Sequence, residues 1–192
     1  MHIAGVDEVG RGCLFGPVVA AAVILPAHHG IRGLNDSKLL DAAERERLDA
    51  LIRQRATAWA IGRGEVNEID QINILQASRL AMRRAVEALS TRPHLLLVDA
   101  VTVESSIPQK ALIKGDSRSH SIAAASIVAK VFRDRLLREW DLEYPAYGLG
   151  RNKGYGTPEH KAALERWGPT ALHRRTFAPV RQLELFAIGA AG

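Results

Sequence analysis

The pattern of apolar and polar positions divides the chain into strand-like and helix-like segments. Residues His2–Val9 form a short strand-like run, and the continuous apolar run Pro17–Leu25 is typical of a strand buried on both faces. The glycine-containing turn between these two runs suits a hairpin. Three further short runs are expected strands, namely Thr57–Gly64, Leu95–Val98 and Ala111–Ile113.

Three longer segments have helical periodicity: Asp41–Arg55, Ile69–Leu89 and Ser119–Trp140. The inward positions expected on the first two are Leu48, Leu51, Ile52, Ile72, Leu75, Leu80, Ala81 and Val86. The third segment begins with the small residues Ala123–Ser126, which predict a close approach of this helix to a sheet.

The order of these elements predicts a mixed α/β sheet with helices packed against it. The last quarter combines a glycine-rich loop, Gly148–Gly156, with a short helix after Pro158 and a tail. No repeat or composition break divides the chain. We therefore expect one domain, residues 1–180, followed by a C-terminal tail, residues 181–192.

Composition narrows the function classes only a little. A length of 192 residues suits one domain with a real core, and the net charge of +5 weakly favours a polyanionic partner. The single cysteine, Cys13, excludes a disulfide framework or a cysteine-rich zinc site within one chain. The sequence has neither a signal-peptide pattern nor an apolar stretch long enough to span a bilayer, so we expect a cytoplasmic protein without membrane contact.

Four carboxylates at element ends suggest the chemistry. Asp7 and Glu8 end the first strand, Asp99 ends the run Leu95–Val98, and Asp116 precedes the small-residue helix. Charged groups at the ends of buried strands lie where clefts form in α/β proteins. Converging carboxylates repel one another unless a hard cation such as Mg²⁺ or Mn²⁺ neutralises them, and such ions can activate water for phosphodiester hydrolysis.

Two alternatives remain open for these acids. Adjacent strand residues point to opposite faces, so Asp7 and Glu8 share one site only if the strand is irregular there, and otherwise Glu8 is merely solvated. Gly10 and Gly12 make a bulge possible. Asp99 and Asp116 can instead have turn or helix-cap roles, which are common for aspartate.

A series of short motifs, in order along the chain, closely resembles the type 2 ribonucleases H. The motifs are Asp7–Gly12, Asp36–Lys38, Leu97–Asp99, Lys114–Ser117, Ala123–Lys130, Asn152–Thr157 and His173–Phe177. Each is weak alone, but together they are specific and cover residues 3 to 180. The acidic motif begins almost at residue 1, which favours type 2 over the related type 3 enzymes with their extra N-terminal domain.

The resemblance implies a ribonuclease H-like fold with a central mixed five-stranded sheet flanked by helices, and a C-terminal helical extension. It implies that Asp7, Glu8, Asp99 and Asp116 are the catalytic and metal-binding residues, with Mn²⁺ or Mg²⁺ as cofactor. One departure is Ala100, because the family usually has glycine after the third acid. Asp134 also resembles a family position, and we expect it to have a structural role in a pair with a nearby base.

Substrate recognition requires a way to tell RNA from DNA, and only the 2′-hydroxyl does so at a given sugar. The resemblance implies that Gly10, Arg11, Gly12 and Tyr155 recognise the RNA–DNA junction. Further candidates for phosphate contact are Lys38, Arg118, Arg174 and Arg175. Without the resemblance, the glycines would indicate only a turn, the tyrosine a packed loop and each cation a solvated charge.

Three histidines, His120, His160 and His173, lack metal-type spacing, and we expect them to be structural or peripheral. In the tail, Gln182–Phe186 resembles the peptide by which many bacterial repair proteins bind the sliding clamp, with leucine and phenylalanine anchors. The alternative is that these anchors pack on the domain.

The predicted function is endonucleolytic hydrolysis of the RNA strand of RNA–DNA hybrids, including cleavage 5′ to single ribonucleotides in duplex DNA, leaving 3′-hydroxyl and 5′-phosphate ends. One rival is another nuclease of the same fold that acts on DNA. A second is a non-catalytic nucleic-acid or clamp-binding module, for which the four acids would be dispensable. We expect a monomer.

Overall fold

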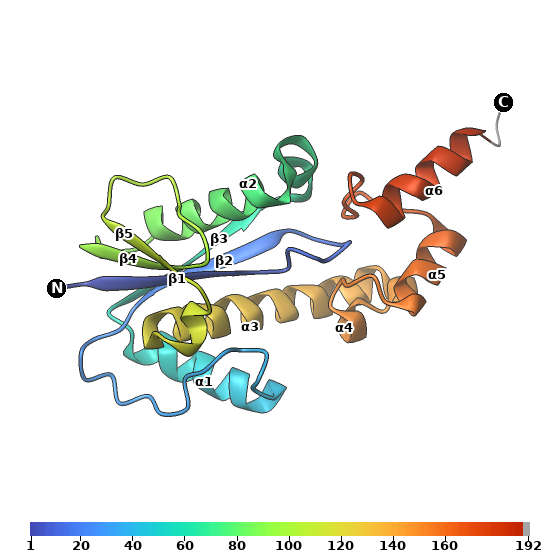
Figure 1. Ribbon diagram of the computed structural model, residues 1–192. Helices are drawn as coiled ribbons and strands as arrows, with labels where there is room; N and C mark the ends of the chain where they lie inside the picture. Colours follow the sequence, from blue (N-terminus) through green and yellow to red (C-terminus); the bar gives the residue numbers. More distant parts are fainter. Residues whose placement is uncertain (190–192) are drawn as a thin grey trace.

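A computed structural model describes the backbone of residues 1–189 and the side chains of residues 1–183 (Figure 1). Five strands form one sheet: β1 (Ile3–Val9), β2 (Val18–Ile24), β3 (Ala58–Gly64), β4 (Leu95–Asp99) and β5 (Gln109–Leu112). The α-helices are α1 (Ala42–Arg55), α2 (Val66–Glu87), α3 (His120–Glu143), α4 (Leu149–Asn152), α5 (Pro158–Trp167) and α6 (Ala178–Gly189). Two 3₁₀ helices are η1 (Gly115–Ser117) and η2 (Pro145–Tyr147).

The sheet has the strand order β3-β2-β1-β4-β5. β1 pairs antiparallel with β2, which pairs antiparallel with β3, whereas β4 runs parallel to both β1 and β5. The expected hairpin and the expected mixed five-stranded sheet are therefore confirmed.

Helices cover both faces of this sheet (Figure 1). α2 packs on one face, where Ala4, Val6 and Val98 belong to its apolar cluster. α1 and α3 pack on the other face with Val19 and Ala21. Every residue of β2 is buried, as its continuous apolar run predicts for a strand covered on both sides.

The close approach of α3 to the sheet depends on Gly5 as well as on the small residues of the helix. A Cβ at Gly5 would lie 2.0 Å from the backbone carbon of Ser121 and 2.3 Å from the amide nitrogen of Ile122. Residues Ala123–Ser126 are buried against the strands, which confirms the expected close packing.

The long helix α2 differs from its expected form in two respects. It begins at Val66, where Glu65 and Glu68 form a capping box, rather than at Ile69. Asn73 has a φ of +68°, which interrupts the helix. This change of phase turns Ile72 outward, 39% exposed, so its expected inward position is wrong.

Two smaller expectations also need correction. The fifth strand comprises Gln109–Leu112, and the expected strand residue Ile113 lies beyond it with 76% exposure. The glycine-rich loop Gly148–Gly156 contains the short helix α4. The half-buried edge strand and the short helix in the loop both contain few apolar residues. The hydrophobic pattern therefore did not locate the end of the strand or the helix.

The C-terminal part extends the domain at the end where the β1–β2 turn lies (Figure 1). Leu164 and Val180 join Phe15 and Leu137 in a third apolar cluster. α6 begins before residue 181, so this helix crosses the expected boundary between domain and tail. Of the predicted clamp peptide, residues 184–186 lie outside the described side chains. Among the described residues, no helix has the length and apolarity needed to cross a membrane.

Candidate active site

The carboxyl ends of two parallel strands bring the predicted acids to one region of the sheet. The last residues that pair between β1 and β4 are Val6 and Val98, so β1 continues beyond its partner. Asp7 and Glu8 therefore lie beside the point where Asp99 ends β4.

Asp7 is held against α3. Its side chain is buried, with 6% exposure, and its Oδ1 accepts a hydrogen bond of 2.7 Å from the amide of Glu8. The hydroxyl of Ser126, on α3, also hydrogen-bonds this carboxylate. Ser126 Oγ lies 2.8 Å from Ser37 Oγ, so the Asp36–Lys38 loop is tied to the first acid.

The strand stays regular through the two adjacent acids. The register with β2 is unbroken from Ala4 to Val9, with Asp7 opposite Ala21 and Glu8 opposite Ala20. The two side chains therefore leave opposite faces, and the bulge that a shared site seemed to require is absent from β1. Glu8 is not merely solvated, because only 11% of its side chain is exposed.

Electrostatics nevertheless couples these acids. Burial raises the pKa of Asp7 well above its usual value, and the negative charges of Glu8 and Asp99 raise it further. Burial also raises the pKa of Glu8, where Arg11 opposes the shift and Asp99 reinforces it. Both acids thus approach Asp99 past the end of β4, and their mutual repulsion favours a proton or a cation.

The fourth acid approaches from η1. Gly115 donates its amide to Asp99 Oδ1 at 2.7 Å, which fixes η1 beside the end of β4. Burial raises the pKa of Asp116, and the charges of Asp36 and Asp99 add to that shift, whereas Lys38 opposes it. Asp99 is therefore the acid that links the other three.

These donors fit a hard divalent cation. All four are carboxylates, the ligand type that Mg²⁺ and Mn²⁺ prefer. Glu8 Oε2 is buried without a hydrogen-bond partner, and such an oxygen is open to a metal. Across the described side chains, however, no three His, Cys, Asp or Glu residues are already spaced as a metal cluster.

The glycine loop and Tyr155 lie side by side. Cys13 forms an isolated antiparallel bridge with Tyr155, and a Cβ built on Gly12 would lie 3.9 Å from the tyrosine ring. Gly10 has a φ of +91°, and a Cβ there would lie 2.2 Å from Arg133 Nε. Tyr155 is 43% exposed. The two segments expected to recognise the junction therefore share one surface.

The structure corrects the expected role of Arg174. Its side chain is fully buried, and its guanidinium donates to the carbonyls of Gly10, Arg11 and Gly16 at 2.7 to 2.9 Å. It is thus enclosed beneath the glycine loop, away from any phosphate. A trans peptide places C=O and the following N–H on opposite sides, so the amides of Arg11 and Gly12 point away from Arg174.

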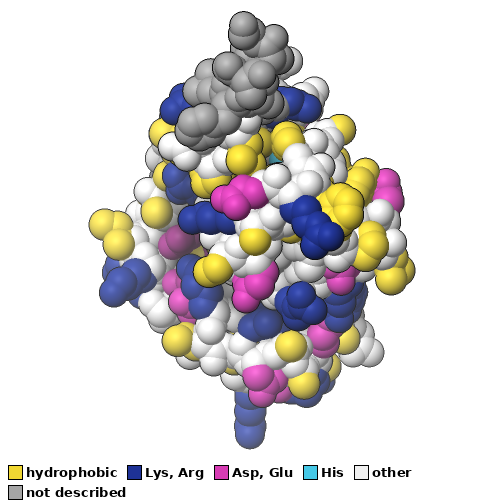
Figure 2. All heavy atoms as spheres, turned by 90° about the vertical axis from the view of Figure 1, so that its right-hand side faces the viewer, with side chains coloured by type: hydrophobic (Ala, Val, Ile, Leu, Met, Phe, Trp, Pro, Cys, Tyr) yellow, Lys and Arg dark blue, Asp and Glu magenta, His cyan; other side chains and the backbone are white. Residues whose placement is uncertain are grey.

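The other predicted cations occupy different places. Lys38 is exposed near Asp116, whereas Arg118 lines a shallow hollow with Met1 and Ile3 at the amino end of β1. Arg175 is exposed, and its amide donates to Asp70 of α2 at 3.0 Å. Figure 2 faces the end of the molecule that carries the C-terminal helices and shows Lys and Arg side chains interspersed with Asp and Glu.

Two residues without a predicted role at the site, Arg133 and Ser126, contact the segments that form it. Arg133 is buried and donates to the carbonyls of Phe15 and Lys153, which joins the glycine loop to the tyrosine loop. Ser126 was expected as a small residue of the motif Ala123–Lys130, without a role at the acids. Asp134 does accept a hydrogen bond from Lys130 at 2.8 Å, so its expected pairing with a base is confirmed.

Comparisons with known proteins agree with the motifs. A sequence profile of the family described as Ribonuclease HII matches residues 4–180. Ribonuclease HII of Solibacter usitatus is 59% identical over 186 residues, which cover 97% of this chain and 82% of that protein. The ribonuclease H2 structure from Pyrococcus horikoshii OT3 has a TM-score of 0.81 at 26% identity, over 97% and 98% of the two chains. The PCNA:RNase HII complex from Archaeoglobus fulgidus gives 0.78 at 24% identity, over 93% and 96%.

Proposed function

This chain belongs to the ribonuclease HII family, and we propose that it hydrolyses the RNA strand of RNA–DNA hybrids and cuts 5′ to single ribonucleotides in duplex DNA. The family makes the protein a ribonuclease H, a phosphodiester hydrolase. The finer substrate choice is supported by one observation: the coupled acids and the exposed pair of glycine loop and Tyr155 lie at the same end of the sheet.

The four acids are the proposed catalytic residues. Asp7, Glu8, Asp99 and Asp116 would hold Mg²⁺ or Mn²⁺, which when bound supplies charge for activating water and stabilising the leaving oxygen. The chain's own contribution is orientation. Ser126 and the Glu8 amide fix Asp7, and the Gly115 amide fixes Asp99. The products would carry 3′-hydroxyl and 5′-phosphate ends.

The glycine loop supplies the recognition of ribose. Because Arg174 turns the Gly10 and Arg11 carbonyls inward, the amides of Arg11 and Gly12 both face outward. Two outward amides side by side suit a 2′-hydroxyl and its neighbouring phosphate. Tyr155 is exposed beside them and suits stacking on a sugar or base.

Phosphate contacts around this centre fall to the exposed cations. Lys38 lies beside Asp116, and Arg175 is held next to α2 by the hydrogen bond from its amide to Asp70. Arg118 remains a weaker candidate because it lines a hollow at the opposite end of β1. These contacts would position the duplex without reading its sequence.

The decisive experiment is cleavage of three labelled duplexes: all DNA, DNA with one ribonucleotide, and a long RNA–DNA hybrid, each with Mg²⁺ or Mn²⁺. We expect cutting at the single ribonucleotide and in the hybrid, lost in Asp7→Asn and kept in the exposed control Glu139→Gln. Cutting only the hybrid would overturn the proposed recognition of the junction. No cutting by folded protein, with binding intact, would favour the non-catalytic module, and cutting of all-DNA duplex would favour a DNA endonuclease.

The tail carries a separate proposal, that Gln182–Phe186 binds the sliding clamp. The Archaeoglobus fulgidus neighbour was solved with PCNA, which motivates the test. Leu183 packs partly buried near Leu164, so it would have to leave that cluster to reach a clamp groove. Deleting residues 181–192 should abolish clamp affinity, and unchanged affinity would end the idea. A monomeric state and a cytoplasmic location remain predictions.

A further inference from the structure

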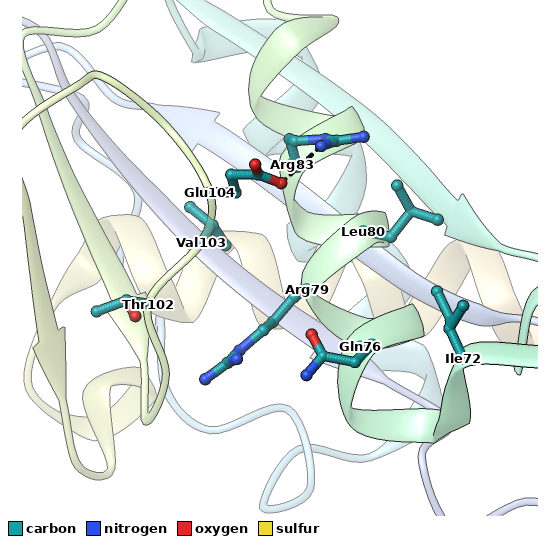
Figure 3. Close-up of a pocket in the computed structure, with 8 residues that line it drawn as sticks. All are labelled: Ile72, Gln76, Arg79, Leu80, Arg83, Thr102, Val103 and Glu104. Carbon is teal, nitrogen blue, oxygen red and sulfur yellow. Dashed lines mark hydrogen bonds and ion pairs between the residues drawn. The ribbon is translucent and has the colours of Figure 1, made fainter.

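A hollow of about 550 Å³ lies beyond Asp99, between α2 and the loop that follows β4. Gln76, Arg79 and Arg83 line it from α2, and Thr102 and Glu104 line it from the loop. Figure 3 shows Arg79 and Gln76 extending from the helix toward the side of Thr102, while Arg83 meets Glu104 at the other end. None of the predicted site residues belongs to this hollow.

The charges in the hollow leave one cation without a counterion. Arg83 donates to Glu104 at 2.8 Å and also lies 3.6 Å from Glu87. Arg79, by contrast, makes no hydrogen bond or ion pair within the described residues, and its Nε is buried without a partner. A buried donor without a partner is uncommon and indicates a site for an acceptor.

The donors around Arg79 suit an anion with several oxygens. Gln76 and Thr102 are exposed, and neither the side-chain amide of Gln76 nor the hydroxyl of Thr102 makes a hydrogen bond within the described part of the chain. A guanidinium beside neutral donors is the arrangement that binds phosphate, because the planar fork donates two parallel hydrogen bonds. The hollow is open and carries charged and polar groups beside the apolar Ile72, Leu80 and Val103, unlike the enclosed, mainly apolar pockets that hold small organic ligands.

The hollow is held at a fixed place relative to the acids. Thr102 follows Asp99 by three residues, and the Val101 amide donates to the Asp99 carbonyl at 2.7 Å. The loop is fastened by Gln109, whose amide group exchanges hydrogen bonds of 2.8 and 2.9 Å with the backbone of Val103. A ligand in the hollow would therefore be in register with the site of cleavage.

We propose that this hollow binds a backbone phosphate of the nucleic-acid duplex, displaced along the strand from the phosphate that is cut. The inference rests on the proposed function, because it takes the polyanion to be the substrate. A duplex carries phosphates at regular intervals along each strand. A second, pre-formed phosphate contact beyond Asp99 would fix the register of the duplex without reading bases.

The test is the salt dependence of duplex binding. We would measure affinity for a duplex with one ribonucleotide by fluorescence anisotropy, in EDTA, at several salt concentrations. Arg79→Gln should weaken binding roughly tenfold and reduce the slope of log affinity against log salt by about 0.9. Single-turnover cleavage at saturating protein should keep its rate, because Arg79 contacts no reacting atom.

Arg92→Gln is the matched control. Arg92 is exposed, makes no ion pair in the described structure and lies three residues before β4, at the strand end opposite the acids. If Arg92→Gln lowered the salt slope as much as Arg79→Gln does, the effect would come from overall charge alone, and the proposed site would be overturned. Unchanged binding in Arg79→Gln would also overturn it.

Two further outcomes identify what occupies the hollow. If inorganic phosphate raises the melting temperature of wild type but not of Arg79→Gln, while duplex affinity is equal in both, the occupant is a free phosphate and the duplex proposal fails. If wild type neither binds nor cuts any ribonucleotide-containing duplex, the proposed function itself has failed. Duplex binding by wild type that is weakened by Arg79→Gln alone supports the site.

Discussion

His160 Nε2 lies 3.1 Å from His173 Nε2, and both rings are fully buried. The Thr170 amide donates to Nδ1 of His173. His173 therefore carries its own proton on Nε2 and donates it to His160. His160 then carries its proton on Nδ1 and donates to the Tyr155 carbonyl at 2.8 Å. Only two neutral rings satisfy every contact, so this chain of hydrogen bonds holds Tyr155 in place through uncharged histidines.

Acid should destabilise the fold that contains this chain of hydrogen bonds. Burial, followed by the charges of His160 and Arg175, lowers the pKa of His173 to about 3. The unfolded histidine binds a proton near pH 6.5, so the folded state binds fewer protons between pH 3 and 6.5. The stability contributed by His173 is therefore complete above about pH 6.5 and is lost as pH falls, by about 2 kcal/mol at pH 5.

Urea unfolding at pH 7.5, 6 and 5 would measure this loss. His173→Asn removes the titrating group, so the variant should start less stable yet fall less steeply with acid, by about 2 kcal/mol over that range. His120→Asn is the control, because His120 lies exposed beside His29. Parallel curves for wild type and His173→Asn would show that the buried pair does not govern the acid response.

Ala100→Gly should stabilise the protein. Ala100 has a φ of +56°, a conformation that favours glycine, and it stands where the family usually has glycine. Relief of the left-handed conformation is worth about 1 kcal/mol, offset in part by the larger entropy of unfolded glycine. We expect a net gain of about 0.5 kcal/mol by urea unfolding.

Ala88→Gly is the matched control for that substitution. Ala88 has a φ of −82° at the end of α2, so glycine there offers no relief and should cost up to about 1 kcal/mol. A loss of stability in Ala100→Gly as large as that in Ala88→Gly would contradict the strain at Ala100.

How much of the fold and of the candidate site was predictable from the sequence depended on whether the interactions are local or join distant residues. β2 was found because a strand covered on both faces reads as one apolar run, and the strand-end acids followed from the positions of β1 and β4. The kink at Asn73 was not predictable, because one residue in a left-handed conformation leaves the polar pattern almost unchanged. Ile72 was misplaced for that reason.

Neighbouring residues of the same type set another limit. Arg174 and Arg175 look equivalent in sequence, yet the first is buried under the glycine loop and the second is exposed. The difference arises from carbonyls of residues 10, 11 and 16, far away in the chain. Likewise, the contact between Ser37 and Ser126 spans 89 positions and has no local signal.

Gly5→Ala should prevent stable folding. A Cβ at Gly5 would lie within 2.0 to 2.3 Å of the backbone of Ser121 and Ile122, and a helix backbone cannot yield as a flexible side chain can. The cost should exceed about 3 kcal/mol, seen as a large fall in melting temperature or loss of soluble protein.

Gly12→Ala separates this packing effect from recognition. The nearest atom to a Cβ at Gly12 is the Tyr155 ring at 3.9 Å, so stability should change by less than about 0.5 kcal/mol. The added methyl group lies on the proposed junction-reading surface, so cleavage at a single ribonucleotide should fall. A Gly12→Ala protein as unstable as Gly5→Ala would contradict the separation of the two roles.

Asp7→Asn should raise the stability of the metal-free protein while removing its response to metal. Asp7 is buried near the charges of Glu8 and Asp99, so a neutral amide relieves repulsion that we put at about 1 kcal/mol, or 2–4 °C in melting temperature. In wild type, Mn²⁺ at a hundred times its dissociation constant should add about 2.7 kcal/mol, because only the folded state assembles the site. Asp7→Asn should show little of that gain, whereas the exposed variant Glu139→Gln should match wild type with and without Mn²⁺.

An equal rise with Mn²⁺ in Asp7→Asn would mean that the metal binds elsewhere. A lower metal-free stability would mean that the hydrogen bonds from Ser126 and the Glu8 amide outweigh the repulsion.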